Sequence, residues 1–159
     1  METTVRTLKD VWHRLCGVRA LQIAAKTKGI PTAWKVSGTA TVTVTTITGT
    51  RIRYTERGSW TAETGAKLSF RNVSQWTLVE HAGVIRLEHL RLGPDKPVHL
   101  LDLTLQEGPV LRSVTPHQCG ADAYSAVMEV EADAISLCWT VKGPTKDEEI
   151  LCRYAYEVI

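Results

Sequence analysis

The sequence of 159 residues lacks any long apolar run and carries almost no excess charge. A membrane-spanning helix needs roughly 18 to 20 consecutive apolar residues, and no run approaches that length. The 19 Lys and Arg residues are nearly balanced by 17 Asp and Glu residues, which leaves a net charge of +2. Proteins that coat nucleic acid need a larger basic excess, because they bind by releasing counterions from phosphates. We therefore predict neither a membrane span nor a nucleic-acid partner.

Cysteine is scarce, and the common catalytic and metal-binding motifs are absent. The four cysteines, at positions 16, 119, 138 and 152, form no Cys-x-x-Cys pair, so there is no zinc-ribbon or thioredoxin motif. The sequence also has no Gly-rich phosphate loop, no nucleophile elbow and no His-Glu-x-x-His motif. These absences disfavour the commonest enzyme classes, and we predict neither a metal nor a cofactor.

The N-terminus has no secretory signal, since its first ten residues lack an apolar core. A mitochondrial presequence is the alternative, because residues 11–55 contain several Lys and Arg residues but no Asp or Glu. However, Glu2 and Asp10 lie inside the segment that such a presequence would occupy. We expect a cytoplasmic protein with free thiols, with a mitochondrial location as the alternative. A disulfide between Cys138 and Cys152 stays open, because each lies in a strand-like run and facing strands could bring them together.

The chain begins with the pattern of one short amphipathic helix, expected over about residues 4–16. Apolar residues spaced by three, four and three positions fall on one helix face. This spacing is carried by Val5, Leu8, Trp12 and Leu15. Thr3 or Thr4 is available as the N-cap, and Gly17 follows the expected end.

From residue 18 onward the hydrophobic period changes to two, which is typical of half-buried β-strands. Clear examples are residues 34–45, 68–78 and 124–131, where apolar and polar residues alternate. Turn sequences such as those at 93–97 and 143–147 separate the runs after eight to twelve residues. We count about nine to eleven strands with no helical pattern between them, which argues against a parallel βαβ fold.

A meander of this length protects its edges best by closing into a barrel. A barrel of about ten strands is too wide for its own side chains to fill, so it tends to leave room for a ligand. The predicted fold is therefore all-β: a single antiparallel up-and-down barrel over about residues 18–158, preceded by the short helix. We expect one domain, as a monomer or a homodimer.

Two motifs in the second half carry a resemblance to a known family. Residues 117–124 read His-x-Cys-x-x-Asp-x-Tyr, and residues 139–147 read Trp-x-Val-x-Gly-Pro-x-Lys-Asp. Weaker matches occur upstream in the right order, at residues 38–40, 54–58 and 97–103. From about Leu15 to Tyr156 the chain resembles the family catalogued as domain of unknown function 6314. The resemblance implies a small lipocalin-like (calycin) β-barrel, and it implies no activity, because the family has none that is settled.

The first motif also supplies the candidate catalytic residues. His117 could act as an acid or base near neutral pH, Asp122 could orient its imidazole, and Cys119 could be a nucleophile if its pKa were lowered. With Tyr124 these residues would serve a cofactor-independent isomerase, lyase or hydrolase. The alternative is a structural corner in which Asp122 caps the turn before it and His117 bonds the backbone.

Glu56 shares a strand face with Tyr54, so its carboxylate is predicted to point into the barrel, unless it lies half solvated at a strand end. A buried carboxylate needs a partner, and Arg71 would serve only if its own face is the inner one. Lys146 either overhangs the barrel mouth or belongs to a simple turn. The predicted ligand-binding residues are Glu56, Tyr54, Trp76, His117, Tyr124, Trp139 and Lys146.

The remaining histidines carry little pattern of their own. His99 alternates with Leu101 and Leu103, so we predict it on that apolar face, with Asp102 on the opposite face. His89 has no informative spacing.

Three hypotheses for the function follow. The leading one is a protein that binds a small apolar or amphipathic molecule inside the barrel. The first alternative is an enzyme that uses His117 with Asp122 or Tyr124, and we favour it less than binding. The second is a non-catalytic interaction subunit whose barrel is filled by its own side chains.

Overall fold

The computed structural model of the protein describes residues 4–27, 36–62 and 64–157. Residue 34, the expected start of one alternating run, lies outside these ranges. The described residues form one α-helix, one 3-10 helix and eleven strands. In chain order these are α1 (Leu8–Cys16), β1 (Ala20–Thr27), β2 (Val36–Thr48), β3 (Arg51–Thr61), β4 (Lys67–Val79), η1 (Glu80–Ala82), β5 (Val84–His89), β6 (Val98–Glu107), β7 (Val110–Ser113), β8 (His117–Cys119), β9 (Asp122–Val130), β10 (Ala134–Lys142) and β11 (Asp147–Ala155).

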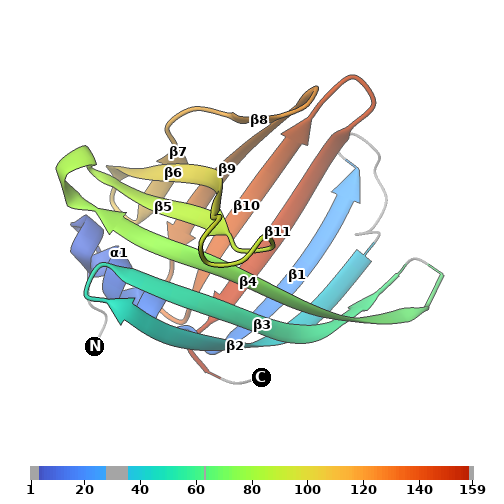
Figure 1. The fold of residues 1–159 in the computed structure, drawn as a ribbon, viewed down its shortest axis with the longest axis horizontal. Helices are drawn as coiled ribbons and strands as arrows, with labels where there is room; N and C mark the ends of the chain where they lie inside the picture. The colour runs from blue at the N-terminus through green and yellow to red at the C-terminus, as the bar shows by residue number, and fades with distance from the viewer. Residues whose placement is uncertain (1–3, 28–35, 63, 158–159) are drawn as a thin grey trace.

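The strands form one closed antiparallel barrel (Figure 1). Each strand from β1 to β7 pairs with the next one, β7 pairs with β9, and β9 continues through β10 to β11. Pairing of β11 with β1 closes the sheet. Ten strands make the barrel, and the short β8 adds to β9 at one rim. The prediction of an all-β, up-and-down barrel with one short helix before it is confirmed.

Helix α1 begins at Leu8, later than the expected residue 4. Its N-cap is Thr7, whose hydroxyl accepts a hydrogen bond from the Asp10 N–H at 3.2 Å, while the Asp10 carboxylate accepts from the Thr7 N–H at 2.9 Å. This reciprocal capping box satisfies two backbone donors at once, so the helix starts there and not after Thr4. Thr3 lies outside the described residues.

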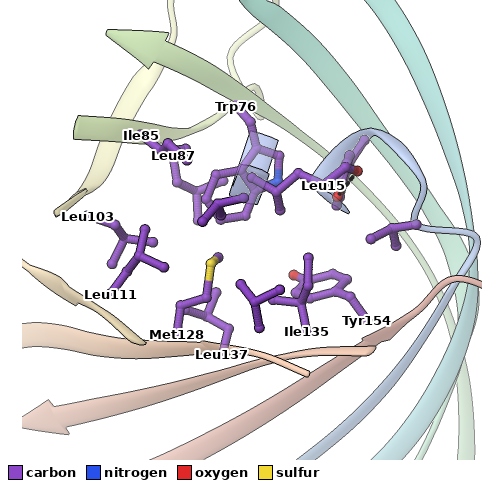
Figure 2. Close-up of a cluster of buried hydrophobic side chains, with 14 of the residues drawn as sticks. Leu15, Trp76, Ile85, Leu87, Leu103, Leu111, Met128, Ile135, Leu137 and Tyr154 are labelled. Atoms are coloured by element: carbon purple, nitrogen blue, oxygen red, sulfur yellow. Dashed lines mark hydrogen bonds between the residues drawn. The ribbon is translucent and has the colours of Figure 1, made fainter. Parts of the chain in front are cut away.

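The helix closes one end of the barrel and packs on a solid core. Leu15 is fully buried in the cluster drawn in Figure 2, which includes Trp76 and Met128. The Tyr54 hydroxyl donates to the Leu15 carbonyl at 2.5 Å and ties β3 to the helix. Tyr54 and Trp76, both predicted to bind ligand, are fully buried in this core. The barrel is therefore filled by side chains at its helix end.

A β-bulge in β6 moves the side chains of its first residues to the opposite face of the sheet from the one that strict alternation predicts. The pairing with β5 passes from His99 directly to Leu101, which leaves Leu100 as an extra residue. His99 consequently lies on the outer side, where its Nε2 is 3.2 Å from Asp102 Oδ1, and Leu100 lies against the interior cavity. The prediction that His99 shares the face of Leu101 and lies opposite Asp102 is wrong, because strict alternation fails at the bulge.

Candidate functional site

A cavity of about 270 Å³ lies inside the barrel, beside the core that packs on α1. An apolar cavity of about 150 Å³ is enough to hold benzene, so this one has room for a ligand of one or two rings. Its walls come from β1, β3 to β6 and β9 to β11. The lining residues are Leu21, Ile23, Glu56, Asn72, Ser74, Leu87, His89, Leu100, Tyr124, Trp139, Ile150, Cys152 and Tyr154.

Glu56 is the one acidic residue among the described residues of this lining. It lies on the inner face of β3, directly opposite Asn72 of β4, and only 3% of its surface is exposed. Its Oε1 accepts a hydrogen bond from Asn72 Nδ2 at 2.9 Å. Its Oε2 is buried and has no hydrogen-bond partner in the part of the chain that the structure describes. Such an orphaned buried acceptor is uncommon, and it marks the carboxyl as the polar feature of the cavity.

A chain of hydrogen bonds from His89 fixes the orientation of that carboxyl. The backbone N–H of Arg91 donates to His89 Nδ1 at 2.8 Å, so Nδ1 is unprotonated and Nε2 carries the proton. Nε2 donates to Asn72 Oδ1, which turns the Asn72 nitrogen towards Glu56 Oε1. Burial and the Arg91 charge lower the pKa of His89, which keeps the ring neutral in this role. These linked hydrogen bonds thereby determine which oxygen of Glu56 accepts from Asn72 and which is left free.

The electrostatics of the cavity are dominated by this one carboxyl. Burial raises the pKa of Glu56, while the hydrogen bond from Asn72 and the nearby hydroxyl of Tyr154 oppose the shift. Burial and the neighbouring Glu56 charge raise the pKa of the Cys152 thiol to about 12, so this cysteine is a neutral packing group at pH 7. Burial likewise raises the pKa of the Tyr154 hydroxyl. Among the described residues, the lining contains no Lys and no Arg.

We expect Glu56→Gln to stabilise the free protein at pH 7 by about 1 kcal/mol, or about 2–4 °C in Tm, because a buried, half-satisfied charge becomes a neutral amide of the same shape. The folded-state pKa of Glu56 lies above its unfolded value, so the wild type loses stability as pH rises through that pKa. The gain from the substitution should therefore shrink below about pH 4. Thermal unfolding at both pH values measures it.

The control is Glu107→Gln, which changes an exposed carboxyl on β6 and should leave Tm unchanged at both pH values. An equal gain from Glu56→Gln at both pH values, or a loss at pH 7, would contradict the burial of an ionisable Glu56.

The structure places the four candidate catalytic residues on the β8–β9 hairpin, where His117 is paired with Tyr124 and Cys119 with Asp122. The Asp122 carboxylate lies 3.6 Å from the Nζ of Lys146, which stands in the turn between β10 and β11. His117 faces Tyr124 across the β8–β9 pair and also packs near the His99 ring, at a centroid distance of 5.8 Å. Cys119 is exposed. Of this cluster only Tyr124 reaches the cavity lining.

The cavity therefore unites Glu56, Tyr124 and Trp139 from the predicted ligand-binding set. Lys146 and His117 lie at the rim of the barrel, in the contacts with Asp122 and His99 just described. Arg71, considered as the partner of Glu56, lies on the outer face of β4 opposite Arg57. Neighbouring side chains on a strand point to opposite faces of the sheet, and Arg71 is the neighbour of the inward-facing Asn72. Arg71 therefore cannot be the partner of Glu56.

Sequence reasoning missed Asn72 and His89. The signal for Asn72 was present, since Asn72 and Ser74 are polar residues on a strand face that otherwise carries Phe70, Trp76 and Leu78. Two polar residues on an inward face indicate a polar feature inside the barrel. His89 had no comparable signal, because its role depends on the pairing of β4 with β5.

The fold and the cavity define the class of protein as a closed ten-stranded antiparallel β-barrel with an interior cavity. Residues 19–156 match the model of a family of unknown function, DUF6314, and the chain belongs to this family. No curated protein and no solved structure matches the chain. Within the described ranges, α1 and η1 are both too short to cross a bilayer as a helix.

Proposed function

We propose that this protein binds a small apolar or amphipathic molecule in the barrel cavity, with Glu56 as the polar anchor. The supporting observation is the Glu56 Oε2 atom, which is buried beside a cavity and lacks a hydrogen-bond partner among the described residues. Leaving such a group unsatisfied costs about 1–3 kcal/mol, and a ligand that hydrogen-bonds to it recovers that energy.

The rest of the lining suits an apolar ligand. Aliphatic residues such as Leu21, Ile23 and Ile150 face the cavity, together with the rings of Tyr124 and Trp139. An apolar wall with a few convergent polar groups is the usual composition of a small-molecule site. The cavity also argues against the alternative of a completely filled barrel.

The enzyme alternative stays a prediction. It requires His117 to act with Asp122 or Tyr124. His117 is paired with Tyr124 on the β8–β9 hairpin, while Asp122 contacts Lys146 and Tyr124 lines the cavity.

Filling the cavity should weaken ligand binding. Ser74 lies on the inner face of β4 and lines the cavity, so Ser74→Leu places a bulky side chain in the ligand's volume. We expect one- and two-ring compounds to raise the Tm of the wild type by several degrees at saturation, since binding to the folded state alone stabilises it by about 2.7 kcal/mol at 100 times Kd. The affinity should fall at least about tenfold in Ser74→Leu, by steric exclusion.

The matched control is Ser69→Leu, on the outer face of the same strand, where the side chain is exposed. It should bind like the wild type. The proposal fails if no compound in a broad panel shifts the wild-type Tm and native mass spectrometry of protein from its own source shows no retained molecule. It also fails if Ser74→Leu binds as well as Ser69→Leu.

A further inference from the structure

We propose that the cavity selects a ligand with a protonated amine on an aromatic or other apolar body, and that Glu56 is the counter-ion of that amine. This inference rests on the proposed binding function and specifies the chemical class of the ligand. It is carried by the composition of the lining and by the geometry around the carboxyl.

The first argument is the charge of the lining. Of the lining residues that the structure describes, Glu56 is the single acidic one, and none is Lys or Arg. His89 is neutral, because its Nδ1 accepts a backbone hydrogen bond and its Nε2 donates to Asn72. A buried charge is normally paired, and here the described residues supply no cation to pair it. A ligand carboxylate would bring a second negative charge next to the first, whereas an ammonium group supplies the missing positive one.

The second argument is the direction of the hydrogen bonds. The chain from the Arg91 backbone through His89 makes Asn72 present its N–H, and not its carbonyl oxygen, to Glu56. The Asn72 donor at Oε1 stabilises the ionised carboxyl and so opposes the burial that raises the pKa of Glu56. The same contact occupies Oε1 and leaves Oε2 as the free acceptor. The ligand group that matches this arrangement is a hydrogen-bond donor with positive charge.

The third argument is the cluster of aromatic rings. Tyr124, Trp139 and Tyr154 line the cavity from the adjacent strands β9, β10 and β11. The faces of aromatic rings attract ammonium groups, and tryptophan does so most strongly. The Glu56 carboxylate and these rings therefore offer an ammonium ligand both a counter-ion and an aromatic surface. They offer neither to a negatively charged ligand.

Three compounds with the same phenyl body test the inference: 2-phenylethylamine, 2-phenylethanol and 3-phenylpropionate, which are positive, neutral and negative at pH 7. Isothermal titration of the full chain gives each affinity. We expect the amine to bind at least about tenfold more tightly than the alcohol, and the propionate to bind most weakly.

Substitution of the carboxyl separates the counter-ion from the cavity. In Glu56→Gln the affinity for the amine should fall at least about tenfold, while the affinity for the alcohol changes by less than about threefold. Glu88→Gln is the matched control, since Glu88 lies on the outer side of β5, where it accepts a hydrogen bond from Gln75 at 3.1 Å. It should keep the preference for the amine.

Equal affinities for the amine and the alcohol, tighter binding of the propionate, or an amine preference that survives in Glu56→Gln would each overturn the inference. Failure of all three compounds to bind would overturn it too. None of these results decides whether the cavity binds ligands of another class, because the Ser74→Leu comparison and native mass spectrometry test that separately.

Discussion

Trp76→Ala is expected to destabilise the protein by about 3–5 kcal/mol, with a fall in Tm of roughly 10 °C. Trp76 has no exposed surface, and its indole packs edge-on against the Tyr54 ring at a centroid distance of 6.1 Å. Figure 2 shows it within the cluster that fills the helix end of the barrel. Removing the ring leaves a large void between the strands and α1, and a closed sheet cannot contract to fill it.

Urea or thermal unfolding measures this loss, with Trp76→Phe as the control. The indole Nε1 has no hydrogen-bond partner among the described residues, so phenylalanine loses volume but no hydrogen bond. We expect Trp76→Phe to cost about 1–2 kcal/mol. If Trp76→Ala unfolds within about 1 kcal/mol of the wild type, the helix end is not the packed core that the structure describes.

Gly58→Ala is expected to cost about 3 kcal/mol or more, because the substitution overpacks two paired strands. A Cβ at Gly58 would lie 1.9 Å from the carbonyl oxygen of Thr39 and 2.6 Å from the Cα of Ala40. Both atoms belong to the backbone of β2, which pairs with β1 and β3 and cannot move without disturbing both. The strain would fall two residues from Glu56, so weaker ligand binding should accompany the loss of stability.

Gly49→Ala is the control for this prediction. Gly49 lies in the turn between β2 and β3, where no atom stands within 4 Å of a new Cβ and where φ is not positive. It should unfold within about 0.5 kcal/mol of the wild type. Identical unfolding midpoints for the two alanine variants would show that β2 and β3 do not approach as closely at Gly58 as described.

The fold class follows from local pattern alone. Alternation with a period of two places every second side chain on the same face, whichever strand lies beside it. Along β3 this pattern is enough to place Ile52, Tyr54 and Glu56 together on one face. Turn sequences at regular spacing then indicate hairpins, and a long series of hairpins favours closure. None of these steps requires knowledge of a contact between distant residues.

The start of α1 shows where local reasoning loses precision. The apolar spacing from Val5 onward predicts a helix, but the capping box of Thr7 and Asp10 decides its first residue. The β6 bulge has a larger effect, since one extra residue at Leu100 moves His99 to the outer side. A bulge depends on the fit of two strands to each other, so the alternation within one strand cannot reveal it.

Period-two alternation along the sequence was enough to predict an antiparallel barrel and to place Glu56 on one face with apolar residues. The tertiary structure was needed to show that Asn72 is the partner of Glu56 and that His89 orients Asn72. It also decided that Tyr54 and Trp76 lie in the packed helix end while Tyr124 and Trp139 line the cavity. The physical reason is that alternation is a property of one strand, whereas register, bulges and the side on which a helix closes the barrel depend on contacts between segments far apart in the chain.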